Sequence, residues 1–264
     1  NKFQSKNVFE SCLIRTWCTA VLLYGWNDPN NKVNELTIHV SPYLKEKHKD
    51  LKIYKVKTGN HPVILGKSIP LFIMFLNYIK KIDQDYWDHL CNIRLLVYDN
   101  YNEMDSNFMP LEFNIIKSKK NNGNIDYVVK ENLCSILPKE ECKDPIMKKE
   151  NIEGFQKDGN LKSFMIWFNI HYKIFNKLNI FNKNKFGNII EEVREVNPRT
   201  GESYEYNKVN IVAHSNIMRD YLKNLILKEI NIYTTNSKIK DLVSIISETN
   251  CSIITTQLDE YNTI

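Results

Sequence analysis

The chain has 264 residues, of which 42% are hydrophobic, enough for one substantial core, but no apolar run approaches the length needed to span a bilayer. The formal net charge of +5 comes almost entirely from lysines that are spread out and alternate with acidic residues. This pattern is typical of a solvated surface, so we expect neither a membrane partner nor a specific nucleic-acid partner. The six cysteines lack CxxC spacing, which favours free thiols in a reducing compartment over a zinc site.

The first third of the chain predicts alternating strands and helices. Residues 6–10 are typical of a short strand that leads into a helix over 13–24, with Ser11 as a candidate N-cap. Alternating apolar residues predict a strand over 36–40. A long helix is expected over 70–81.

The remaining elements predict an α/β layered fold with hairpin insertions. In chain order they are a hairpin with strands at 113–117 and 125–129, an exposed Lys/Glu-rich segment at 138–160, an aromatic amphipathic helix at 164–175, a hairpin with strands at 193–196 and 204–206, a strand at 209–213 and a weaker strand at 251–255.

The strand at 209–213 ends abruptly in His214. Ser215 and Asn216 follow it and can cap a helix. A histidine at a strand end, beside the free N–H groups of a helix start, is suited to binding an anion such as phosphate. The alternative is a core histidine at an ordinary strand–helix junction.

Arg15 lies about one turn into the first predicted helix. Its guanidinium and the helix N-terminus can point at one place, and arginine binds phosphate oxygens in a planar fork. Taken alone, a surface arginine on an amphipathic helix is the simpler interpretation. Together with His214, a phosphate-binding arginine becomes the preferred interpretation.

Two motifs together carry a family resemblance. Ser-x-Leu-x-Arg-x-x-x-Thr-Ala at 11–20, followed much later by His-Ser-Asn-x-x-Arg at 214–219, resembles the histidine phosphatase superfamily, also called phosphoglycerate mutase-like. The resemblance covers roughly 6–46 and 205–228. It implies a three-layer α/β fold with a mainly parallel central sheet and hairpin or loop insertions. We expect a single domain over 1–264, with a lysine-rich insertion at about 100–160.

The resemblance also implies residue roles. Arg15 would be the pocket arginine, His214 the second, catalytic pocket histidine that binds the transferred phosphoryl group, and the Ser215 N–H could assist. Glu46, in a Leu-Lys-Glu run, fits the general acid that protonates the leaving oxygen. A solvated charge is the alternative for Glu46. The family's chemistry requires no metal or other cofactor, and the expected partner is a small phosphorylated substrate.

The family's nucleophile is absent from the printed sequence. It is a histidine in an Arg-His-Gly motif upstream of the arginine helix, and this chain contains no Arg-His pair. Either the motif precedes Asn1, which the missing methionine favours, or the protein is a catalytically inactive relative with a structural or interaction role. The expected function is therefore phosphomonoester hydrolysis through phosphohistidine, with the inactive relative as the alternative.

The composition also bears on the source of the protein. Heavy use of Lys, Asn and Ile indicates an A+T-rich genome, such as that of a large DNA virus or a protist. A cytoplasmic location is expected, or a virion location if the protein is viral. The oligomeric state and the substrate's identity stay open.

Overall fold

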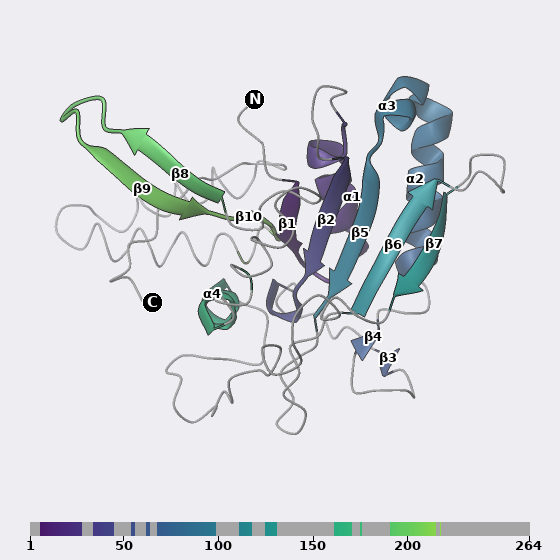
Figure 1. The fold of residues 1–264 in the computed structure, drawn as a ribbon. Coiled ribbons are helices and arrows are strands. Elements are labelled where there is room, and N and C mark those ends of the chain that lie inside the picture. Colours follow the sequence, from purple (N-terminus) through teal and green to yellow (C-terminus); the bar gives the residue numbers. More distant parts are fainter. Residues whose placement is uncertain are drawn as a thin grey trace, which may run out of the picture.

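A six-stranded sheet forms the centre of the molecule, with strands in the order β10-β1-β2-β5-β6-β7 (Figure 1). The computed structural model describes residues 6–27, 34–44, 54–55, 62–63, 68–98, 111–117, 125–130, 161–170, 175, 191–214 and 217. The parallel neighbours are β10 (Asn210–Val212), β1 (Asn7–Glu10), β2 (Glu35–Val40) and β5 (Asn92–Val97). The first predicted hairpin extends the sheet as the antiparallel strands β6 (Leu111–Lys117) and β7 (Ile125–Lys130). The expected mixed α/β class with a mainly parallel sheet is therefore confirmed.

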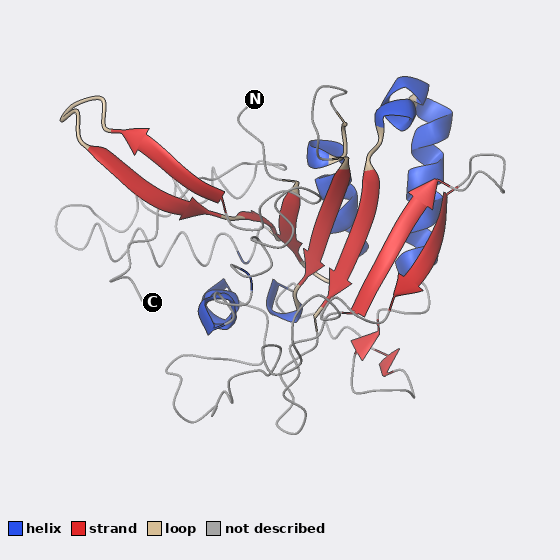
Figure 2. Ribbon diagram, in the orientation of Figure 1, coloured by secondary structure: helices blue, strands red, loops and turns tan. Residues whose placement is uncertain are grey.

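Helices lie in the connections between parallel strands, where such crossovers are required. They are α1 (Ile14–Tyr24) between β1 and β2, and α2 (Ser68–Ile82) and α3 (Gln84–His89) before β5 (Figure 2). The α2 helix contains the predicted range 70–81, and Pro70 lies in its first turn, where its missing N–H costs no helical hydrogen bond. The side chain of Asp83 caps α3 by accepting the Tyr86 N–H at 2.9 Å.

The predicted helix cap at Ser11 is wrong. The α1 helix begins at Ile14, with Leu13 in the capping position and no side-chain cap. Ser11 Oγ instead accepts the Leu13 N–H at 3.2 Å. The chain uses two more residues to turn out of β1, so Ser11 precedes the capping position and stabilises the strand-to-helix turn.

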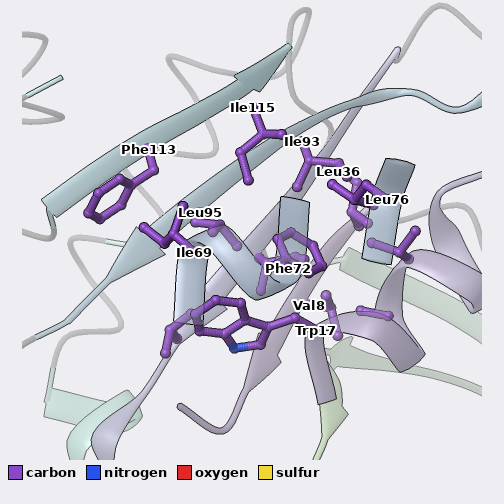
Figure 3. Packing of buried hydrophobic residues seen from close by; sticks show 14 of the residues in the cluster. Val8, Trp17, Leu36, Ile69, Phe72, Leu76, Ile93, Leu95, Phe113 and Ile115 are labelled. Atoms are coloured by element: carbon purple, nitrogen blue, oxygen red, sulfur yellow. The ribbon is translucent and has the colours of Figure 1, made fainter. Parts of the chain in front are cut away.

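One face of the sheet is apolar and is covered by α1 and α2 (Figure 3). Alternate strand residues point to the same face, so each strand contributes every second side chain to this core. The strand contribution includes Val8, Leu36, Ile38, Ile93, Leu95, Phe113 and Ile115. Trp17 of α1 and Phe72 of α2 meet edge to face above them, with ring centroids 5.5 Å apart.

The opposite face carries an aromatic cluster around Phe9, with rings from α4 (Leu161–Ile170) and from Phe175. The Phe9 ring lies edge-on to Phe164, Trp167, Phe168 and Phe175, at centroid distances between 5.4 and 6.3 Å. Edge-to-face contacts at such distances are favourable beyond the area that they bury. The apolar stripe of the predicted aromatic helix is therefore buried, as expected of core residues.

The same face also buries polar side chains that bond to one another. Asn7 Oδ1 accepts from His39 Nε2 at 3.1 Å, so Nδ1 of the neutral ring accepts the Tyr98 hydroxyl at 2.8 Å. Burial, and secondarily the charge of Arg94, lowers the pKa of His39 to about 3. The Arg94 guanidinium bonds to Glu35 at 2.5 Å and lies 3.8 Å from Glu112.

A second hairpin projects from the sheet beside β10 (Figure 1). Its strands are β8 (Glu191–Val196) and β9 (Ser203–Lys208), as the sequence predicted. Gly201 closes the turn at φ 72°, in the left-handed region that glycine adopts at no steric cost. A small strand pair, β3 (Tyr54–Lys55) and β4 (Pro62–Val63), and a 3-10 turn, η1 (Pro42–Leu44), complete the elements.

Several expectations fall outside the described residues. They are the exposed segment at 138–160, the strand at 251–255 and all but Ile217 of the helix after His214. Within the described ranges, no helix is both long and apolar enough to cross a membrane.

Candidate functional site

The structure brings Arg15 and His214 into direct contact, although 199 positions separate them in the chain. Arg15 Nε and Nη2 lie 3.2 and 3.1 Å from His214 Nδ1. The contact follows from topology: β1 and β10 are adjacent and parallel, and Glu10 is paired with Val212 at their carboxyl ends. The first turn of α1 and the second residue after β10 therefore meet at one edge of the sheet.

Ser11 is a third member of this site that the sequence did not single out as a site residue. Its hydroxyl oxygen lies 2.8 Å from His214 Nε2, and both residues are buried. Sequence reasoning gave Ser11 only a capping role, although it opens the arginine motif and directly follows a strand. We refer to Ser11, Arg15 and His214 as the edge cluster.

The hydrogen bonds of the edge cluster define the tautomer of His214. A guanidinium has donors only, so His214 Nδ1 must present its lone pair to Arg15. The proton of the neutral ring is then on Nε2 and is donated to Ser11 Oγ. This direction is opposite to that of a serine nucleophile activated by a histidine base, which needs the lone pair on the nitrogen that faces the hydroxyl. The edge cluster is arranged to bind rather than to generate a serine nucleophile.

Glu10 adds no negative charge to this region, although it directly precedes Ser11. Its side chain is fully buried, and neither carboxyl oxygen has a hydrogen-bond partner. Burial raises its pKa well above the usual value, and the nearby Thr16 hydroxyl opposes this only in part. That hydroxyl bonds to the backbone carbonyls of Ser11 and Leu13. Because Glu10 stays protonated, the positive charge of Arg15 is not offset by the nearest acid in sequence.

Two predicted site residues, Glu46 and Ser215, lie outside the described residues. The last described residue before Glu46 is Leu44, and the last described residue before Ser215 is His214. The Ile217 N–H donates to the His214 carbonyl at 3.0 Å.

Other reactive groups of the described residues show no second site of comparable chemistry. Cys12, Cys18 and Cys91 are free thiols, and burial raises the pKa of both Cys18 and Cys91 to about 11. Thiols with such pKa values are poor nucleophiles at neutral pH. Within the described ranges, no three His, Cys, Asp or Glu side chains are grouped to hold a metal ion.

Comparison of the chain with protein-family models, with curated proteins and with solved structures finds no match. Function therefore has to be inferred from the edge cluster and its place in the sheet.

Proposed function

We propose that the protein is a phosphomonoester hydrolase of the histidine phosphatase type, with a three-layer phosphoglycerate mutase-like fold. The contact between Arg15 and His214 at the carboxyl edge of two adjacent parallel strands carries this proposal. Ligands of open α/β sheets bind outside the carboxyl ends of the strands. A guanidinium fork beside an imidazole suits the oxygens of a phosphoryl group.

In the proposed reaction, Arg15 and His214 stabilise the charge on the phosphoryl oxygens while the group passes to a nucleophilic histidine. The Ser215 amide would assist at the helix start, and Glu46 would protonate the leaving oxygen. Water then hydrolyses the phosphohistidine. Arg15 provides donors and positive charge, and His214 donates to the phosphoryl group once its Nδ1 is protonated, so this route uses no metal or other cofactor, and the substrate is a small phosphorylated molecule.

The nucleophile belongs, on this proposal, to a strand that precedes Asn1. The outer side of β10 is a suitable place for it, because β10 is the outermost strand on this side among the residues that the structure describes. The β10 residues are only partly buried, whereas all four residues of β1 are buried. A parallel strand added along β10 would end beside His214 and would complete the edge cluster with a second histidine.

Hydrolysis of p-nitrophenyl phosphate by the protein with its upstream residues tests this function. We expect Arg15→Ala and His214→Ala each to lower kcat/KM by about 100- to 1000-fold, the typical loss for one transition-state donor. Arg199→Ala, in the exposed hairpin turn, is the matched control and should retain full activity. A folded protein that carries an upstream Arg-His-Gly motif and still hydrolyses no phosphomonoester would contradict the proposal.

The absence of an Arg-His pair from the printed chain favours one second candidate. In that case the protein is a catalytically inactive relative that keeps the edge cluster within a structural or interaction protein. Binding of inorganic phosphate without turnover, in a protein whose upstream residues lack Arg-His-Gly, would identify this candidate.

A further inference from the structure

We propose that Ser11 is a positioning residue that fixes the ring orientation of His214 by accepting its Nε2–H, while the donor-only Arg15 guanidinium on Nδ1 sets the tautomer. The part of Ser11 in turnover rests on the proposed function, but the hydrogen bond itself does not. The Ser11 Oγ–His214 Nε2 distance of 2.8 Å is the shortest contact in the edge cluster.

Ser11 is itself held firmly by α1. Its carbonyl oxygen accepts the Trp17 Nε1–H at 2.8 Å, and its hydroxyl oxygen accepts the Leu13 N–H at 3.2 Å. Trp17 is fully buried in the apolar core, so its bond connects Ser11 to that core. A serine with no exposed surface cannot reach a substrate, and it therefore acts through His214.

The two ring nitrogens of His214 have different kinds of partner. Arg15, on Nδ1, is exposed, and its long side chain can turn toward an anion. Ser11, on Nε2, is fixed by its own bonds and stays in place when Arg15 moves. Ser11 therefore keeps the Nδ1 edge of the ring facing the position of the Arg15 guanidinium. When an anion draws Arg15 away, Nδ1 can take up a proton and donate it to the anion.

Nitrogen NMR of the ¹⁵N-histidine-labelled protein tests this placement directly, with the His214 signals assigned from a His214→Gln variant. In the wild type we expect His214 to carry its proton on Nε2. In Ser11→Ala the Nε2 proton of His214 loses its acceptor, so we expect a shifted Nε2 signal and an affinity for inorganic phosphate about fivefold to tenfold weaker, the effect of one lost hydrogen bond. Ser11→Thr keeps a hydroxyl and should retain the wild-type Nε2 signal.

Ser41 provides a closely matched control. It is fully buried, directly follows β2, and its Oγ accepts the Tyr43 N–H at 3.3 Å, so it makes the same kind of turn at the neighbouring strand end. Ser41→Ala removes that turn bond and leaves the Ser11–His214 bond intact. We expect its His214 Nε2 signal to be unchanged and its phosphate affinity to stay within about twofold of the wild type.

The outcomes separate the positioning role from the function. A wild-type His214 with its proton on Nδ1 would overturn the proposal without any variant, and so would a folded Ser11→Ala protein whose His214 Nε2 signal matches that of the wild type. If Ser11→Ala does not fold, a shifted Nε2 signal in Ser11→Thr overturns it instead. A shifted Nε2 signal in a Ser11→Ala protein that neither binds phosphate nor hydrolyses phosphomonoesters supports the positioning role and counts against the proposed function.

Discussion

The two faces of the sheet are buried by different chemistry. On the α1–α2 face, the strands present apolar side chains to Trp17 and Phe72. On the α4 face, the same strands present His39 and Arg94, which bond to other buried polar groups beside the aromatic cluster. Polar residues that alternate with core residues, such as Thr37, His39 and Arg94, are therefore buried on a second face rather than exposed.

Each face also holds an acid or a base whose neutral form is favoured by burial. Glu10 is an acid on the apolar face, where it shares the side of Val8 and has no hydrogen-bond partner. His39 is a base on the polar face, where both ring nitrogens are bonded. The unpartnered acid should destabilise the fold as pH rises, and the partnered base should do so as pH falls.

The largest expected effect comes from the ion pairs of the polar face. Arg94→Met leaves the Glu35 and Glu112 carboxylates without their shared guanidinium, and we expect a loss of about 3–5 kcal/mol in urea unfolding. Arg194→Met is the control, because Arg194 lies 3.7 Å from Glu205 with both side chains mostly exposed. It should cost less than about 1 kcal/mol. Equal losses in the two variants would contradict the distinction between buried and exposed pairs.

A smaller effect is expected from His39. His39→Leu removes the imidazole from Asn7 and Tyr98, and we expect a loss of about 2–3 kcal/mol at pH 7. Because the folded pKa is about 3, the unfolded ring binds a proton below about pH 6.5 and the folded ring does not. Wild-type stability should therefore fall as pH drops from about 6.5 toward 3.

Denaturant unfolding at several pH values measures this slope, and the part due to His39 should be missing in His39→Leu. His89→Leu is the control, since His89 is partly exposed on α3. A His39→Leu protein with the wild-type slope in this pH range would show that another group titrates there.

The smallest effect, and the only gain, is expected from Glu10. The folded pKa lies above the unfolded value, so the folded carboxyl keeps its proton while the unfolded one loses it above about pH 4.5. Stability should therefore fall as pH rises from that value toward the folded pKa. Glu10→Gln stays neutral and should be more stable than the wild type at pH 7 by about 1–2 kcal/mol, with the difference vanishing near pH 4.

Glu202→Gln, at the exposed hairpin turn, is the control for Glu10→Gln and should change stability at pH 7 by less than about 0.5 kcal/mol. A Glu10→Gln protein that is less stable than the wild type at pH 7 would mean that the carboxylate has a partner in the folded state.

The sequence anticipated those parts of the fold that have a clear local pattern. The helices α1 and α2 and both hairpins have strong periodicity or turn residues. Each of their ends lies within two residues of the predicted end. The contact between Arg15 and His214 could be anticipated only from the paired motifs, because 199 positions separate the two residues.

Other parts gave no usable local signal. The central strand β5 is buried on both faces, so it shows no alternation of exposed and buried residues. The charged Arg94 within it also makes a core strand hard to recognise from the sequence. The α3 helix has six residues, too few for helical periodicity to be recognised. The Ser11–His214 bond depends on the exact turn between β1 and α1, where capping rules pointed to a different partner for the hydroxyl.

The pairing of β1 with β10 also determines when the edge cluster can exist during synthesis. A ribosome adds about 5–20 residues per second, so His214 emerges about 10–40 s after Arg15. The strands β1, β2, β5, β6 and β7 precede β10 in the chain and can pair with one another first. The cluster is therefore completed late, onto a sheet that is already formed, and truncated chains would carry Arg15 without the histidine that it contacts.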